Sequence, residues 1–250
     1  MGKRAGRSPF VETVLTVIYA VLIAIVIRTV LFEPFNIPSG SMRPTLEVGD
    51  YLFVSKFSYG YSRYSMPFGL GLFSGRIFGS DPERGDVVVF RKPSEPTTDY
   101  IKRIVGLPGD KIQVTDGVLS INGTPVPRVR VDDYLEQLPN GGVRRIEQYR
   151  ETLPNGVTYL TFNLIDGSKA DNTGVYEVPP GHYFAMGDNR DDSIDSRYPP
   201  EIGGVGFVPA ENLVGRADLI FFSSDGSASL LEPWNWFGAI RYNRLLQVIR

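Results

Sequence analysis

The sequence has 250 residues, of which 42% are hydrophobic and 22% charged, a composition typical of a globular protein. Its formal net charge of -2 argues against a nucleic-acid-binding protein, because binding to phosphate needs an excess of Lys and Arg. The absence of cysteine excludes thiol catalysis, disulfide bonds and cysteine-ligated zinc.

The first predicted element is a membrane anchor at residues 13–32. This stretch is mainly apolar and is broken only by Arg28, and about 20 mainly apolar residues can span a bilayer as a helix. A cleaved secretory signal is the alternative, but no small-x-small cleavage site follows before Glu33 and Pro34. We therefore predict an anchor that remains attached to the protein.

The tail that precedes the anchor, residues 1–12, is basic. It carries Lys3, Arg4 and Arg7, and positively charged flanking segments stay on the cytoplasmic side of a membrane. The sequence therefore predicts a single-pass protein with a cytoplasmic N-terminus. Everything after residue 32 then lies on the outer face of the membrane.

A turn with two serines follows the anchor, in the stretch FNIPSGSMRPTL at residues 35–46. Pro38 and Pro44 restrict the backbone on either side of the serines, and Gly40 lets the chain bend between Ser39 and Ser41. A serine hydroxyl is a weak nucleophile and needs a neighbouring base. If one of these serines attacks a substrate, the base must come from another part of the chain.

Short β-rich segments separated by turn residues make up most of the remainder, so we predict a mainly β fold. Asn122-Gly123 is a strong hairpin signal among them. We divide this part into a catalytic β domain (33–126 and 178–225), an inserted smaller β region (127–177) and a C-terminal aromatic and basic segment (226–250). The predicted strands are 51–56, 86–92, 100–106, 111–114, 117–126, 156–164, 183–186 and 218–222.

Two aromatic segments are candidates for contact with the membrane. Residues 57–80 combine aromatics and glycines and contain no acid, and the C-terminal segment places Trp234 and Trp236 near Arg241 and Arg244. Trp favours the membrane interface, and basic residues are attracted to anionic lipid. Packing of both segments on the β core is the alternative.

Lys102, in YIKRIVG, is the plausible base for a serine nucleophile. The one histidine, His182, follows a Pro-Pro-Gly turn, and we interpret it as a structural residue at a strand edge. Arginine is not deprotonated in proteins, so Arg103 is unsuitable. Burial can lower the pKa of a lysine by up to ~3 to 5 units. The alternative for Lys102 is a surface lysine on an edge strand.

The last polar segment is GDNRDDSIDSRY, at residues 187–198. A calcium loop is disfavoured because Arg190 and Arg197 lie among the acids. We predict an ordered turn held by ion pairs. Since one histidine and no cysteine are present, we expect no metal and no cofactor.

Four segments follow the anchor in this order: FNIPSGSMRPTL, GDVVVFRKP, DYIKRIVGLPGD and GDNRDDSIDSRY. Together they resemble the motifs of the bacterial type I signal peptidases, also called leader peptidases. The resemblance covers the anchor and most of residues 33–222. It implies a membrane-bound serine endopeptidase with a Ser-Lys dyad on a mainly β fold. The implied roles are a nucleophile (Ser41), a general base (Lys102), an oxyanion-hole hydroxyl (Ser39), a hydroxyl that orients the base (Ser193) and a structural ion pair (Asp195 and Arg197).

The same resemblance implies a substrate and a location. It implies that the protein removes signal peptides from exported preproteins at the bacterial plasma membrane. Signal peptides carry small residues at the first and third positions before the cut, so we expect two shallow pockets. The candidate pocket residues are the apolar neighbours of the catalytic residues: Phe35, Ile37, Pro38, Met42, Leu46, Tyr100, Ile101 and Ile194. The oligomeric state is left open.

Two rival functions remain at this point. A self-cleaving, repressor-type Ser-Lys protease shares the chemistry, but the anchor and the lack of DNA-binding helices argue against it. A membrane-anchored β domain could instead bind peptide or cell-wall ligands without catalysis. This second rival predicts that Lys102→Arg leaves the function intact.

Overall fold

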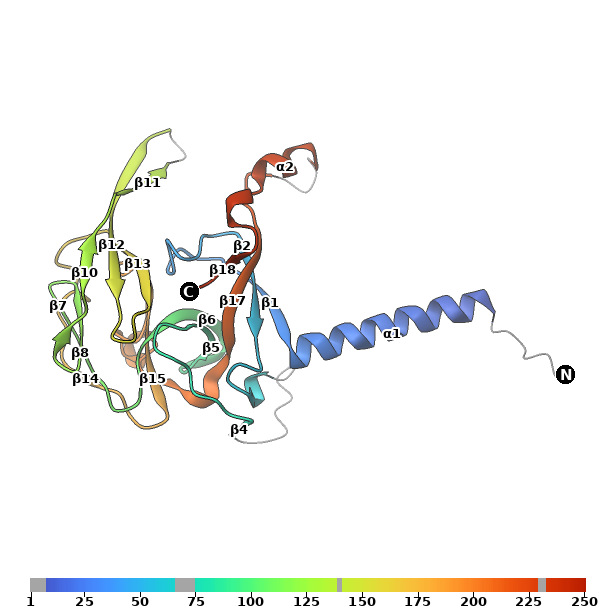
Figure 1. Cartoon of the computed structure of the whole chain (residues 1–250), viewed down its shortest axis with the longest axis horizontal. Helices are drawn as coiled ribbons and strands as arrows, with labels where there is room; N and C mark the ends of the chain where they lie inside the picture. Colours follow the sequence, from blue (N-terminus) through green and yellow to red (C-terminus); the bar gives the residue numbers. More distant parts are fainter. Residues whose placement is uncertain (1–7, 66–74, 139–140, 229–232) are drawn as a thin grey trace.

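The computed structural model describes residues 8–65, 75–138, 141–228 and 233–250 (Figure 1). One long helix, α1 (Pro9–Val30), projects away from a β-rich body. It begins at a proline, which suits the first helical turn because the N–H groups there have no partner in the helix. No residue of α1 is buried, and by length and composition it could cross a membrane. An exposed apolar helix thus occupies the predicted anchor, a few residues nearer the N-terminus.

The largest sheet has eight strands in the order β1-β2-β17-β5-β6-β15-β16, with β18 also paired to β17. All of its neighbouring strands are antiparallel. Because β17 lies between β2 and β5, segments far apart in the sequence are neighbours in the centre of this sheet. Its strands are β1 (Phe32–Asn36), β2 (Asp50–Ser55), β5 (Val87–Lys92), β6 (Glu95–Gly106), β15 (His182–Met186), β16 (Val208–Pro209), β17 (Leu213–Ser223) and β18 (Gln247–Val248).

Three smaller sheets accompany the large one, and the two built from β7 to β14 lie on the left in Figure 1. One has the order β14-β7-β8-β9, a second has the order β10-β12-β11 with β13 also paired to β12, and a third pairs β3 with β4. These strands are β3 (Tyr61–Ser62), β4 (Arg76–Ile77), β7 (Lys111–Thr115), β8 (Val118–Ile121), β9 (Thr124–Pro125), β10 (Arg128–Arg130), β11 (Tyr134–Gln137), β12 (Val143–Thr152), β13 (Thr158–Asn163) and β14 (Tyr176–Glu177).

Helical elements are short in the described part of the β body. The helix α2 (Trp236–Ala239) lies near the C-terminus. The others are 3-10 turns: η1 (Arg63–Ser65), η3 (Pro200–Ile202), η4 (Ala210–Asn212), η5 (Pro233–Asn235) and η6 (Tyr242–Arg244).

The apolar core joins the sheets. One cluster contains Val105 and Phe184 of the large sheet, Leu119 of β8, and Leu153 and Tyr159 from the 127–177 region. The 127–177 region therefore shares a core with the rest of the body. A second cluster, beneath β2, β5 and β17, contains the apolar residues of the serine turn.

The prediction of a mainly β fold is confirmed, and each predicted strand overlaps an observed one. Asn122 and Gly123 have φ of 53° and 77°, the left-handed values that a tight hairpin turn requires. The prediction missed β12, whose sequence VRRIEQYRET is mostly polar and lacks a regular alternation of apolar residues. It also missed β1, which starts directly after the anchor.

The two aromatic segments lie partly on the surface. Within 57–80, residues 66–74 are outside the described part, Tyr59 is buried, and Phe57 and Phe78 are exposed. In the C-terminal segment, the side chains of Trp234 and Phe237 are 71% and 74% exposed. Neither segment is wholly packed on the core.

Candidate active site

The serine turn connects β1 to β2 and is anchored by its own apolar residues. Ile37, Met42 and Leu46 are buried in one core cluster. Within the turn, the Arg43 N–H donates to the Gly40 carbonyl at 3.1 Å. Because buried side chains hold the turn along its length, the backbone around Ser41 is fixed.

The 187–198 loop packs directly against this turn. The Asn189 backbone N–H donates to the Ser41 carbonyl at 3.1 Å, and its side-chain Nδ2 donates to the Gly40 carbonyl at 3.0 Å. A Cβ atom at Gly187 would lie 2.5 Å from the Ser41 carbonyl oxygen, which is too close for any side chain. Glycine at position 187 therefore allows the loop to approach the serine turn.

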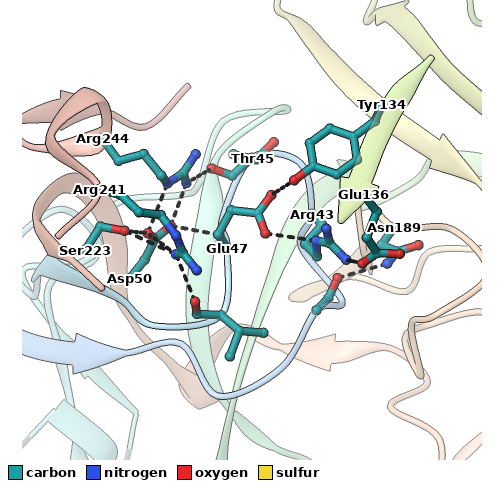
Figure 2. Close-up of polar contacts among 12 residues, drawn as sticks. Arg43, Thr45, Glu47, Asp50, Tyr134, Glu136, Asn189, Ser223, Arg241 and Arg244 are labelled. Atoms are coloured by element: carbon teal, nitrogen blue, oxygen red, sulfur yellow. Dashed lines mark hydrogen bonds and ion pairs between the residues drawn. The ribbon is translucent and has the colours of Figure 1, made fainter. Parts of the chain in front are cut away.

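The other face of the turn is held by the C-terminal segment (Figure 2). The Arg244 guanidinium donates to both carboxylate oxygens of Asp50, at 3.0 and 2.5 Å, and to the Thr45 carbonyl at 3.0 Å. Arg241 donates to the Val48 carbonyl at 2.9 Å. Two arginines that the sequence suggested for lipid contact thus bind other residues of the protein.

Lys102, on β6, brings its amine to Ser41. The Nζ atom lies 2.7 Å from the Ser41 Oγ and 2.9 Å from the Ile101 carbonyl oxygen. Both side chains are almost fully buried, with 3% of Lys102 and 7% of Ser41 exposed. No salt bridge to Lys102 is present in the described residues. The amine is therefore buried without a directly bonded counter-ion.

Burial lowers the pKa of Lys102 to about 8. The negative charges of Asp195, Asp188 and Asp192 act in the opposite direction, but they do not compensate for the loss of solvent around the ammonium group. An appreciable fraction of the amine is consequently neutral near neutral pH. A neutral amine can accept the proton of a serine hydroxyl.

The neighbouring residue on β6, Arg103, is also buried but is fully paired. Its Nε and Nη2 donate to the two carboxylate oxygens of Asp188 at 2.8 and 2.7 Å, and its Nη1 donates to the Gly85 carbonyl at 2.7 Å. Strand alternation separates Lys102 and Arg103, and the sequence leaves open which of the two faces is buried. The structure buries both.

Ser39 and Ser193 lie beside the Ser41–Lys102 pair. The Ser39 and Ser41 Oγ atoms are 3.5 Å apart. Ser193 is buried and lines the same groove, but no hydrogen bond joins it to Lys102 in the described residues.

Asp195 and Arg197 form a buried ion pair in the 187–198 loop. The Arg197 Nε and Nη2 donate to the Asp195 carboxylate, each at 2.9 Å. Burial opposes ionisation of Asp195, but the charge of Arg197 and hydrogen bonds from Arg197 and the Gly187 N–H outweigh it and hold the pKa of the carboxyl below its ordinary value. The pair is therefore charged and fixes the loop that carries Ser193.

A groove of about 590 Å³ opens over Ser41 and Lys102. Its walls include six of the apolar residues considered for the substrate pockets: Phe35, Ile37, Pro38, Tyr100, Ile101 and Ile194. Met42 and Leu46 do not line it, because both are fully buried in the core below the turn. Three carboxylates, Asp99, Asp191 and Asp192, also line the groove.

Sequence reasoning missed the residues that hold the site together. Asn189 and Asp188 belong to the motif GDNRDDSIDSRY, so their position in that motif was the available signal. Nothing local to Arg103 indicated its partner, which is 85 residues away.

The family model for signal peptidase, peptidase S26, matches residues 10–222. The chain belongs to the signal peptidase family. It is 46% identical to a signal peptidase I of Rickettsia typhi over 248 residues, with 92% of this chain and 90% of that protein covered. It is 42% identical to the signal peptidase I of Rickettsia conorii over 248 residues, with 92% and 89% covered. A crystal structure of a signal peptidase I from Enterococcus faecalis aligns at 27% identity and a TM-score of 0.32, over 55% of this chain and 97% of that chain.

As a signal peptidase, the protein is a serine endopeptidase that removes signal peptides. Its substrates are preproteins, and the exposed apolar helix α1 indicates that it is anchored in a membrane.

Proposed function

We propose that Ser41 is the nucleophile of this signal peptidase and Lys102 its general base. The observation that supports this is the 2.7 Å distance between the Nζ of Lys102 and the Oγ of Ser41, two buried residues that line the groove. The neutral amine takes the hydroxyl proton as the Ser41 Oγ attacks the carbonyl carbon of the scissile bond. The resulting ammonium then gives this proton to the leaving amine.

The second half of the reaction regenerates the enzyme. When the amine of the mature protein leaves, the signal peptide remains bound to Ser41 as an ester. Lys102, neutral again, takes a proton from water, and the resulting hydroxide attacks the ester carbonyl. The proton returns to the Ser41 Oγ as the signal peptide leaves with a free carboxylate.

The oxyanion of the tetrahedral intermediate would be bound by the Ser41 backbone N–H and the Ser39 hydroxyl. Their position on one turn supports this assignment, since the Ser39 and Ser41 Oγ atoms lie 3.5 Å apart. Removing one such donor typically costs about 2.7 to 4 kcal/mol of transition-state stabilisation.

Ser193 and the Asp195–Arg197 pair support the base in this proposal. Ser193 is buried in the groove wall, and the ion pair fixes its loop. With its loop held in this way, Ser193 limits the positions that the Lys102 side chain can adopt.

The apolar walls of the groove would accept the small residues at the first and third positions before the cut. Phe35, Ile37 and Ile101 line the groove beside Ser41, and side chains of this size leave shallow pockets. A large residue at either substrate position would overfill them.

We further propose that the catalytic body rests on the outer face of the bacterial plasma membrane, with the N-terminus in the cytoplasm. The basic tail supports this orientation. The side chains of Trp234 and Phe237 are exposed. Phe32, at the end of the anchor, packs edge-on against the half-exposed Phe57, with 5.5 Å between the centres of the two rings. Because Arg241 and Arg244 are engaged with the serine turn, the aromatic side chains rather than these arginines supply the contact.

The dyad is tested by incubating the purified protein with a preprotein and identifying the cleaved bond by mass spectrometry. Ser41→Ala and Lys102→Arg are both expected to abolish cleavage, because arginine cannot give up its proton. Circular dichroism serves as the control for folding. Cleavage at the wild-type rate in folded Lys102→Arg would refute the assignment.

The membrane contact is tested with the intrinsic fluorescence of the chain, which has two tryptophans. In Trp236→Phe, Trp234 is the remaining tryptophan, and we expect lipids brominated in the acyl chains to quench it when the full chain is placed in a bilayer. Lack of quenching, with strong quenching by aqueous iodide instead, would rule out this contact.

A further inference from the structure

The side chain of Arg43, two residues after Ser41, lies next to Glu136 and Tyr134 (Figure 2). Both of these residues belong to β11, which forms an antiparallel hairpin with β12. Its Nε donates to the Glu47 carboxylate at 2.9 Å, and its Nη1 donates to the Glu136 carboxylate at 2.6 Å. The Tyr134 hydroxyl donates to Glu47 at 3.3 Å. We call these four residues, Arg43, Glu47, Tyr134 and Glu136, the Arg43 cluster.

The Arg43 cluster is sheltered from solvent. The side chains of Arg43, Glu47 and Glu136 are 17%, 14% and 21% exposed. The Arg43 guanidinium also lies 5.2 Å from the centre of the Tyr134 ring and 5.8 Å from that of Phe162, within the range of a cation–π contact. Partial burial makes these charge interactions stronger than those of an exposed ion pair.

The cluster connects the serine turn to a strand of the 127–177 region. Glu136 is 93 residues from Arg43 and lies on β11, which pairs with β12 alone among the described strands. The hairpin projects from the body in Figure 1. The bond between Arg43 and Glu136 therefore ties the end of a projecting hairpin to the serine turn.

Arg43 is also linked to the nucleophile through the backbone. Its N–H donates to the Gly40 carbonyl, so the turn that contains Ser41 closes at Arg43. The Gly40 carbonyl accepts a further bond from Asn189 on the opposite side. A shift of Arg43 would be transmitted to Ser41, whose Oγ must remain within hydrogen-bond distance of Lys102.

We propose that Arg43 is a positioning residue for cleavage, and that Glu136 from the 127–177 region is its partner. This role rests on the proposed function of Ser41 as the nucleophile. The cluster touches neither the substrate groove nor Lys102, so it acts on the direction of the Ser41 hydroxyl and not on substrate binding. A misplacement of about 1 Å can cost up to about 10²-fold in rate.

The test compares kcat and KM for preprotein cleavage by the full chain in detergent. The variants are Arg43→Gln, Arg43→Lys and Glu136→Gln, with Glu147→Gln as the matched control. Glu147 lies on the same hairpin and accepts a bond from Arg130 at 2.8 Å in an exposed ion pair. Glu147→Gln removes one negative charge, as Glu136→Gln does, but leaves the contacts of the serine turn unchanged.

We expect Arg43→Gln and Glu136→Gln each to lower kcat by about 10-fold while KM changes less than about twofold. The substitutions affect the direction of the Ser41 hydroxyl and not substrate binding. The kcat of the double variant should be no lower than that of the Arg43→Gln single variant, since both substitutions break the same bond between Arg43 and Glu136. Arg43→Lys should recover part of kcat. Glu147→Gln should behave as the wild type.

Values of kcat within about twofold of wild type in both Arg43→Gln and Glu136→Gln would overturn the proposal, as would an equal fall in Glu147→Gln. If Arg43→Gln fails to fold, the kcat of Glu136→Gln decides whether the proposal holds, because β11 keeps its pairing with β12 in that variant. The dyad is judged separately by Ser41→Ala. Normal kcat in the cluster variants with an inactive Ser41→Ala refutes the positioning role alone.

Discussion

Lys102 and Arg103 are adjacent on β6 and are both buried, yet their surroundings differ. Arg103 has a bidentate partner in Asp188, whereas Lys102 has a hydroxyl and a carbonyl. A buried cation with a counter-ion remains charged and holds the structure, while one without a bonded counter-ion is driven toward its neutral form. The presence or absence of a paired carboxylate thus separates a structural cation from a candidate base.

The largest expected effect comes from removing the unpaired cation. Lys102→Met keeps the length and apolar stem of the side chain but removes the amine. We expect kcat/KM to fall by about 10⁴-fold, the upper end for loss of a general base. The free energy of unfolding should stay equal or rise, because a buried amine is replaced by an apolar group. Parallel cleavage assays and urea unfolding measure the two quantities.

Removing the paired cation should have the opposite pattern. Arg103→Met leaves the Asp188 carboxylate buried without its partner, which typically costs about 3–5 kcal/mol of stability. We expect the urea midpoint to fall strongly. The double variant Arg103→Met/Asp188→Leu should recover much of the loss, since no charge is then left unpaired. No recovery in the double variant would mean that packing, not charge, makes Arg103 important.

The smallest expected effect concerns the pH profile. The ammonium form of Lys102 cannot accept a proton, so kcat/KM should rise with pH through a midpoint of about 8 and be lost as pH falls below it. Asp192 favours the charged form, and Asp192→Asn should therefore move the midpoint to lower pH. The profile is measured with one peptide substrate across the range.

Salt provides a control for the Asp192 effect. At 1 M salt the screening length is about 3 Å, so the difference between the wild-type and Asp192→Asn midpoints should shrink. A shift of the midpoint to higher pH, or none at low salt, would show that the charge of Asp192 does not reach the amine.

The sequence predicted the chemical groups of the site better than their supports. Ser41 and Lys102 could be proposed because only certain side chains can act as nucleophile or base and because each lies in a short motif. The pairs that fix them, Arg103 with Asp188 and Arg43 with Glu136, join residues 85 and 93 positions apart. Such partners are selected by folding, and no local pattern marks them.

The same contrast holds for the strands. β5, with sequence VVVFRK, has a continuous apolar run because its residues are buried on both faces. In β12 the burial pattern is irregular, and its two buried residues are Ile146 and Glu151. Glu151 is buried because Arg190 of the 187–198 loop pairs with it. A strand stabilised by distant charges does not produce the period-two pattern by which strands are recognised.

The contact between Arg244 and the Thr45 carbonyl spans 199 residues of sequence. Synthesis proceeds at about 5–20 residues per second, so Arg244 is made roughly 10–40 s after Thr45 of the serine turn. During this interval the turn has left the ribosome without Arg241 and Arg244 against Val48, Thr45 and Asp50. Protease activity should therefore arise late in biosynthesis, after the C-terminal segment has been made and has docked against the serine turn. A nascent signal peptidase would be inert toward the preproteins exported alongside it.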